Sequence, residues 1–196
     1  FKHVSVVPEG LNFEPLKVLP EKDSKPIVVF SGRLKRAKRP DHAIKAFAIV
    51  NLKIPNAELW VFGAGPFRQT LECIAGSGVK FFGNLNNFER RDQLVKSWVL
   101  IVPGVREGWG LNVIEANALG VPAVAYDAPG LCDSVRNQET GLLAENGNIK
   151  DLAEKTIRIL SDNSLRKKLS VEALDYSKQF SWEKTADEFM KLITNE

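Results

Sequence analysis

The sequence predicts an α/β domain built on a parallel sheet with helices on both faces. Short apolar runs alternate with amphipathic segments through most of the chain, and the connections between them are short. The runs are apolar throughout rather than at every second residue, which is typical of strands that are covered on both faces. Strands that alternate with helices in this way form parallel sheets, and such sheets bind ligands at the carboxyl ends of their strands.

The expected strands and helices follow one another along the chain. Apolar runs predict strands at residues 27–31, 58–62, 79–82, 99–102 and 122–126. The amphipathic segments between them predict helices at residues 41–51, 67–75, 88–96 and 109–119. Gly120 ends the last of these helices in the usual C-terminal position, and a Pro129-Gly130 turn follows the last strand.

The two ends of the chain depart from this alternation. Residues 3–7 predict a strand, followed by an irregular stretch up to residue 25. From residue 149 onward the pattern is helical, with helices expected at residues 151–160, 165–180 and 182–193. Ser181 is the expected N-cap of the last helix, although a lysine at its third position excludes a capping box.

The composition is that of a globular protein and excludes several functions. The chain has 196 residues and no apolar run long enough to span a bilayer. A net charge of +3 is too small to indicate nucleic-acid binding. Cys73 and Cys132 form no CxxC pair and fit a reducing compartment, so a cytoplasmic location is expected. Because the only histidines are His3 and His42, no metal site is predicted.

The segment at residues 107–115 carries most of the chemical information. Gly108 and Gly110 open the helix that follows a buried strand, and backbone N–H groups left uncovered at a helix start can bind phosphate. The carboxylates of Glu107 and Glu115 would repel a phosphate, but they can accept hydrogen bonds from the hydroxyls of a sugar or a ribose. The alternative is that Glu107 only complements the helix dipole and Glu115 is solvated, and the residues alone favour neither interpretation.

A basic cluster follows the first expected strand, at the same edge of the sheet as Glu107. Residues 32–39 hold five arginines and lysines, which suit the negative charge of a diphosphate. Arg33 comes directly after Gly32 at the strand end, so its position is the most constrained, and Lys38 is intermediate. The remaining three are interpreted as surface charge: Lys35, Arg36 and Arg39.

Glycines and aromatic residues at the other strand ends are less specific. Gly63 and Gly65 follow the second strand and lack the third glycine of a dinucleotide-binding fingerprint, so a tight turn is expected there. Phe82 and Gly83 end the third strand, where they would form a wall for a nucleobase, although core packing explains Phe82 at least as well. The tryptophans are expected to pack in the protein interior: Trp60, Trp98 and, for the last helix, Trp182.

Glu107 and Glu115, with seven residues between them, resemble the E-x7-E motif of retaining family 4 glycosyltransferases. These enzymes have the GT-B fold, with two facing Rossmann-like domains. The resemblance extends in order along nearly the whole chain, through residues 31–34 with Lys38, then 59–66, 79–83, 116–125, 129–130, 140–143 and 180–183. It implies the C-terminal half of such an enzyme, the half that binds a nucleotide sugar.

The resemblance also implies a role for each candidate residue. Arg33 and Lys38 would hold the diphosphate of the donor and stabilise it as the leaving group. Glu107 would bind sugar hydroxyls, and Glu115 would bind ribose hydroxyls. The other residues expected to contact the donor are Gly32, Phe82, Gly83, Gly108, Gly110, Leu111, Asn112, Val113 and Gly130. The donor is a nucleoside-diphosphate sugar, and no metal or other cofactor is expected.

The same resemblance divides the chain into three parts. Residues 1–20 would form the junction between the two halves, residues 21–179 the donor-binding domain, and residues 180–196 the C-terminal crossover helix. Phe1 then stands at the boundary between the halves. We therefore expect a fragment that lacks its acceptor-binding N-terminal domain and turns over little or no substrate by itself.

Two residues depart from the family pattern, and several alternatives remain open. Trp109 stands where phenylalanine is commoner, and Arg39 stands where a glycine often follows the lysine. The expected reaction is hexose transfer with retention. The alternatives are a non-catalytic nucleotide-sugar-binding or regulatory domain, an epimerase or phosphorylase of the same fold, and nucleic-acid binding by residues 33–39. The donor base (UDP, GDP or ADP), the acceptor, and membrane contact of the full-length protein are left open.

Overall fold

The computed structural model describes residues 5–11 and 14–194. Within these residues, six strands form one parallel sheet in the order β3-β2-β1-β4-β5-β6. The strands are β1 (Ile27–Ser31), β2 (Glu58–Phe62), β3 (Val79–Gly83), β4 (Val99–Val102), β5 (Ala123–Tyr126) and β6 (Gly141–Ala144). The α/β class and the parallel sheet predicted from the sequence are confirmed.

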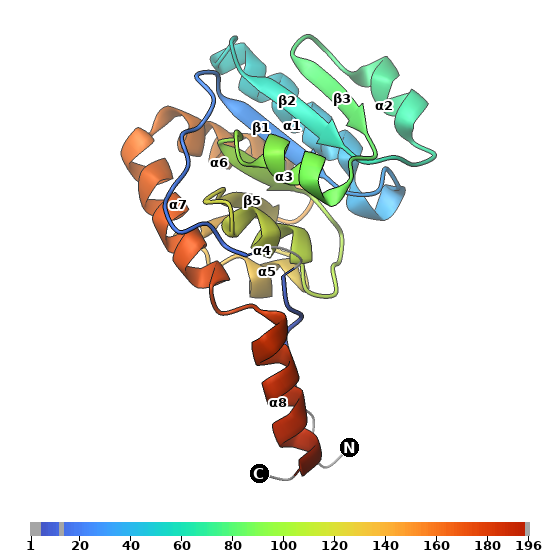
Figure 1. Cartoon of the computed structure of the whole chain (residues 1–196). Helices are drawn as coiled ribbons and strands as arrows, with labels where there is room; N and C mark the ends of the chain where they lie inside the picture. Colours follow the sequence, from blue (N-terminus) through green and yellow to red (C-terminus); the bar gives the residue numbers. More distant parts are fainter. Residues whose placement is uncertain (1–4, 12–13, 195–196) are drawn as a thin grey trace.

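Helices cover both faces of this sheet (Figure 1). In the view of Figure 1, α3 and α4 lie in front of the sheet and α1 lies behind it; α1 packs on α6, and α4 packs on α7. The helices are α1 (Pro40–Lys53), α2 (Arg68–Ile74), α3 (Asn87–Leu94), α4 (Leu111–Asn117), α5 (Leu131–Ser134), α6 (Ile149–Ser161), α7 (Asn163–Ser177) and α8 (Trp182–Thr194), with a 3-10 turn, η1, at Arg36–Lys38.

The strands form the core and fix where a ligand can bind. Every residue of β1, β4 and β5 is buried, as expected for strands covered on both faces. β1 lies inside the sheet between β2 and β4, so its carboxyl end is flanked by theirs. Since all the strands are parallel, the loops that lead to the helices gather at this single edge.

Some element boundaries differ from those expected. The helix expected at residues 109–119 begins at Leu111, because Gly110 adopts a left-handed conformation with φ 78°. The strand β6, the short helix α5 and the turn η1 were not predicted; β6 reads Gly-Leu-Leu-Ala, which has no β-branched residue to indicate a strand. Of the strand expected at residues 3–7, residues 3 and 4 lie outside the described residues and residues 5–7 form no strand.

The last helix, α8, extends away from the sheet, and the described N-terminal segment runs beside its start (Figure 1). Thr185 Oγ1 donates a hydrogen bond to the Pro8 carbonyl at 2.8 Å, and the Lys184 N–H donates to Ser181 Oγ as expected for an N-cap. Trp182, expected to pack, is 49% exposed. Other large apolar side chains on α8 are also exposed: Phe189, Met190, Leu192 and Ile193. No helix in the described part of the chain is long and apolar enough to cross a membrane.

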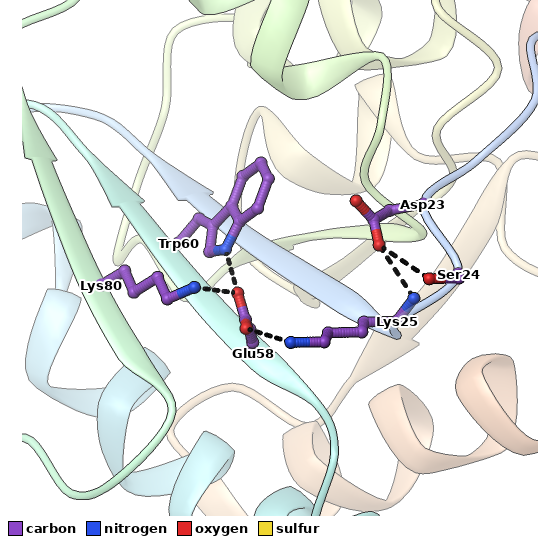
Figure 2. A network of polar contacts seen from close by, with 6 residues as sticks. All are labelled: Asp23, Ser24, Lys25, Glu58, Trp60 and Lys80. Atoms are coloured by element: carbon purple, nitrogen blue, oxygen red, sulfur yellow. Dashed lines mark hydrogen bonds and ion pairs between the residues drawn. The ribbon is translucent and has the colours of Figure 1, made fainter.

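A polar network lies at the amino end of the sheet, opposite the edge that carries the candidate site (Figure 2). Glu58, the first residue of β2, accepts hydrogen bonds from Trp60 Nε1 at 2.8 Å, Lys80 Nζ at 2.7 Å and Lys25 Nζ at 3.4 Å. Hydrogen bonding from Lys80, followed by that from Trp60, lowers the pKa of the Glu58 carboxyl. Trp60 is 8% exposed, so it is a core residue as the sequence indicated.

Candidate functional site

Two turns that require glycine bring the loops after β4 and β5 together. Gly110 (φ 78°) and Gly130 (φ 81°) both adopt left-handed conformations, which cost non-glycine residues energy. A Cβ at Gly110 would lie 2.5 Å from Ser134 Oγ, and one at Gly130 would lie 2.1 Å from the Glu107 carbonyl oxygen. The Glu107 N–H also donates to the Pro129 carbonyl at 3.0 Å. Gly130 therefore allows the Glu107 loop to lie directly against the loop after β5.

Lys38 and Glu107 form an ion pair across this edge. The lysine follows β1 and the glutamate follows β4, and a backbone hydrogen bond from Val105 to Ala37 joins the two loops. The side chains are only 24% and 10% exposed, respectively. The second carboxylate oxygen of Glu107, Oε1, is buried and has no hydrogen-bond partner among the described residues. A buried acceptor without a partner is uncommon, and it can accept a hydrogen bond from a ligand hydroxyl.

The start of α4 is tied to the end of β1. Asn112 Nδ2 donates to the Ser31 carbonyl at 3.1 Å. The Val113 N–H is engaged with the Gly110 carbonyl at 2.7 Å. Within the described residues the N–H groups of Leu111 and Asn112 have no acceptor. Of the backbone groups expected to meet a phosphate here, these two are the ones still available.

Glu115 is buried within α4 and paired with Arg90 of α3. Arg90 Nη1 donates to Glu115 Oε2 at 2.5 Å, and Arg90 Nη2 donates to Oε1 at 2.8 Å. The Glu115 side chain is 3% exposed and that of Arg90 is 19% exposed. The alternative interpretation of Glu115 as a solvated surface residue is therefore wrong. Two parallel N–H···O bonds fix the relative orientation of the two planar groups.

A hollow of about 240 Å³ opens at the carboxyl ends of β1, β2 and β3. Its walls come from the ends of these strands, from the loops that follow them and from α3: Ser31, Gly32, Arg33, Phe62, Gly63, Ala64, Asn84, Leu85 and Arg90. Arg33 is exposed and makes no ion pair with a described residue. The hollow thus combines a flat, mostly apolar wall with two arginines.

Phe82 and Gly83 stand one layer behind this wall. The ring of Phe82 packs edge-on against Phe62 with the centroids 5.3 Å apart, and it also contacts Trp60. The Gly83 carbonyl accepts a hydrogen bond from the Gly63 N–H at 2.6 Å. Both residues therefore support residues of the wall, and of the two open interpretations of Phe82 the structure favours packing.

Arg39 is more than the surface charge that the sequence indicated. It adopts a left-handed conformation (φ 45°, ψ 50°) just before α1, which explains why glycine suits this position in the family pattern. Its Nη1 donates to Asn146 Oδ1 at 2.9 Å, and its guanidinium lies 5.7 Å from the centre of the Tyr126 ring. These contacts connect the loop after β1 with the loops after β5 and β6. Gly108, by contrast, is exposed.

Arg90 is the site residue that the sequence analysis missed. It lies in the first turn of α3, which begins directly after β3 because Asn86 and Glu89 form a capping box. A capping-box pattern after a strand would have placed the residues of this turn at the carboxyl edge of the sheet. The partner of Arg90 was not predictable, because the sequence separates it from Glu115 by 25 positions.

Comparison with known proteins gives a consistent picture. The sequence profile described as "Glycosyl transferases group 1" matches residues 14–175. A D-inositol 3-phosphate glycosyltransferase of Rhodococcus jostii is 32% identical over 173 residues, which cover 82% of this chain and 38% of that protein. A GDP-mannose-dependent monoacylated alpha-(1-6)-phosphatidylinositol monomannoside mannosyltransferase of Corynebacterium glutamicum is 28% identical over 185 residues, 89% of this chain and 48% of that protein.

A solved structure supports the same assignment at the level of the fold. Sucrose-phosphate synthase of Thermosynechococcus elongatus superimposes with a TM-score of 0.80 and 27% identity, covering 96% of this chain and 51% of that one. The chain thus spans between two fifths and half of the length of these relatives, as one Rossmann-like half of a GT-B enzyme does. On its sequence and its fold, the chain belongs to the glycosyl transferases group 1 family.

Proposed function

We propose that this chain is the donor-binding half of a retaining glycosyltransferase, which transfers a hexose from a nucleoside-diphosphate sugar to an acceptor bound by another domain. Family membership supports the reaction class. The name of the relative from Corynebacterium glutamicum gives GDP-mannose as the donor of that enzyme. The observation that carries the proposal is the Lys38–Glu107 ion pair, which leaves a buried carboxylate oxygen without a partner beside the exposed Arg33 loop.

The charges at this edge suit the two parts of such a donor. Arg33 and Lys38 would neutralise the diphosphate and stabilise it as it leaves, because fixed cations favour the charge that develops in the transition state. The N–H groups of Leu111 and Asn112 would add donors to the same phosphates. The unpartnered oxygen of Glu107 would accept a hydroxyl of the sugar.

The nucleoside would occupy the hollow at the ends of β1, β2 and β3. Its wall around Phe62 suits a flat base, and Glu115, behind Arg90, would serve the ribose hydroxyls. During transfer, the acceptor oxygen would bond to the anomeric carbon on the face from which the phosphate leaves. The departing phosphate would take the proton of the acceptor, so the configuration is retained without a base from this half.

The acceptor would be held by a second domain that packs against α8. The exposed apolar side chains of this helix support such a contact, as does the share of each relative that the chain covers. In this proposal residues 1–20 form the junction, residues 21–179 the donor domain and residues 180–196 the crossover helix. Alone, the chain would bind donor but transfer little sugar, and a transfer rate typical of whole enzymes would contradict this.

The test compares sugar nucleotides with their parent diphosphates by calorimetric titration. We expect the chain to bind one matched pair, such as UDP-glucose and UDP, or GDP-mannose and GDP. Glu107→Ala should weaken binding of the sugar nucleotide about tenfold, since a lost hydrogen bond to a carboxylate costs about that factor, while binding of the parent diphosphate changes little. Equal binding of the sugar nucleotide to both proteins would contradict the role of Glu107.

A further inference from the structure

Arg90 stands between the buried carboxylate of Glu115 and the hollow. Its guanidinium uses two N–H groups on Glu115, and its side chain forms part of the wall of the hollow. Glu115 itself is 3% exposed and does not line the hollow. A ligand in the hollow therefore meets Arg90 before it meets Glu115.

The pair is expected to persist when a ligand binds. Separating two partly buried charges leaves the carboxylate without compensation, and removing one partner of such a pair is strongly destabilising. A guanidinium has five N–H donors and no acceptor. With two N–H groups held by Glu115, three remain, and the ion pair fixes the plane in which they lie. Arg90 is thus a rigid group that only donates hydrogen bonds.

The positions of the cations indicate which part of a nucleotide meets Arg90. Lys38 pairs with Glu107 on the side of β1 and β4, so the phosphates are expected on that side. Arg90 lies at the opposite side, on the α3 that follows β3. There it faces the wall that includes Phe62, Ala64 and Leu85, which suits a planar base. The base, rather than the diphosphate, is therefore the part of the nucleotide nearest to Arg90.

We propose that Arg90 is a specificity-determining residue that donates hydrogen bonds to a keto oxygen of the base, so that the donor is a uracil or guanine nucleotide. Arginine donates readily to adjacent acceptors such as O6 and N7 of guanine. Cytosine and adenine carry an amino group at the corresponding position, and this group is a donor. Two donors facing each other leave the arginine N–H unsatisfied, which costs affinity. This inference rests on the proposed donor site.

Two matched ligand pairs test it, because UDP and CDP differ at one ring position, and GDP and ADP differ in their keto and amino groups. Calorimetric titration of the wild-type chain should show a preference for the keto member of at least one pair, by about tenfold for one hydrogen bond to a charged donor. In Arg90→Met this preference should vanish, through weaker binding of UDP or GDP with binding of CDP and ADP unchanged. Arg90→Lys keeps the charge without the fork and should not restore it.

Two further variants guard against loss of folding. Arg90→Met together with Glu115→Gln removes the charge that the single variant leaves buried, and it should show the same loss of preference. Arg158→Met, at an exposed position of α6, is the matched control and should bind like wild type. Thermal unfolding confirms that each variant is folded.

The other outcomes overturn the inference in distinguishable ways. Equal weakening of all four nucleotides in Arg90→Met would mean that Arg90 serves the phosphates or the fold. Tighter binding would mean that the Arg90–Glu115 pair blocks the site. A wild-type preference for ADP or CDP would refute the reading of the base but leave the proposed donor site standing. Binding of none of the four nucleotides would refute both.

Discussion

The carboxylate of Glu107 contacts the ammonium of Lys38 through one oxygen and buries the other without a partner. The two residues are 69 positions apart in the sequence, and the parallel arrangement of β1 and β4 brings them together. One interaction thus holds two loops and leaves one acceptor for a ligand. Its energetic consequences can be measured without any ligand.

Lys38→Met should destabilise the protein by about 1–3 kcal/mol, because the nearly buried Glu107 carboxylate keeps its desolvation without its charge partner. Adding Glu107→Gln should recover much of this loss, since the amide is neutral. Urea unfolding of the two single variants and the double variant gives the coupling energy. Arg36→Met, an exposed neighbour in η1, is the control. Purely additive effects would show that the ion pair contributes nothing.

Gly130→Ala should lower the free energy of unfolding by about 2 kcal/mol or more, because it adds a left-handed conformation and a backbone clash. The added Cβ would lie 2.1 Å from the Glu107 carbonyl. Gly83→Ala also has a positive φ, but its Cβ would meet nothing within 4 Å, and Gly76→Ala has neither problem. Unfolding experiments should therefore rank the losses in the order Gly130, Gly83, Gly76. A loss at Gly130 no larger than that at Gly83 would mean that the loops part easily.

Substitutions at Arg39 should separate backbone strain from side-chain contacts. Arg39→Ala loses the bond to Asn146 and the contact with Tyr126 while keeping φ at 45°. Arg39→Gly loses the same contacts but relieves a left-handed conformation, which costs about 1–2 kcal/mol for a residue with a side chain. The glycine variant should therefore have the higher unfolding temperature of the two. The reverse order would mean that the loop adjusts its backbone.

His42 should make stability depend on pH. Its Nδ1 lies 2.9 Å from the Tyr126 hydroxyl, and burial lowers the pKa of the imidazole from 6.5; Arg39 and Lys45 add to this and Asp41 opposes it. The unfolded chain then binds the proton more readily, so this contribution to stability is present above pH 6.5 and is lost as the pH falls through the folded pKa. Between pH 7.5 and 5, wild type should lose more unfolding free energy than His42→Gln. Parallel curves for the two proteins would refute this.

The sequence predicted the parts of the fold that depend on local patterns. The strand Val99–Val102 was found because it is apolar throughout, and the helix at Pro40–Lys53 because its apolar residues recur at helical spacing. The strand Gly141–Ala144 was missed because leucine and alanine favour a helix as much as a strand. Its environment in the sheet, and not its own residues, makes it a strand.

The candidate site was predictable only as a set of strand ends. The sequence identified Arg33, Lys38 and Glu107 because each follows a buried run at one edge of the sheet. It did not indicate that Glu115 is buried, or that Arg90 is its partner, because both depend on how α3 and α4 pack together. The exposed Trp182 was misjudged for a similar reason: packing of a helix depends on neighbours that its own sequence does not specify.

The most direct test of the central claim is calorimetric titration of this chain with UDP, GDP and ADP, followed by the same titrations of Arg33→Ala and Glu115→Ala. We predict that at least one of these nucleotides binds. Arg33→Ala should weaken that binding about tenfold by removing a cation from the diphosphate, and Glu115→Ala should weaken it by releasing Arg90. Binding that neither substitution alters, or no binding of any of the three nucleotides, would contradict a nucleoside-diphosphate site at this edge of the sheet.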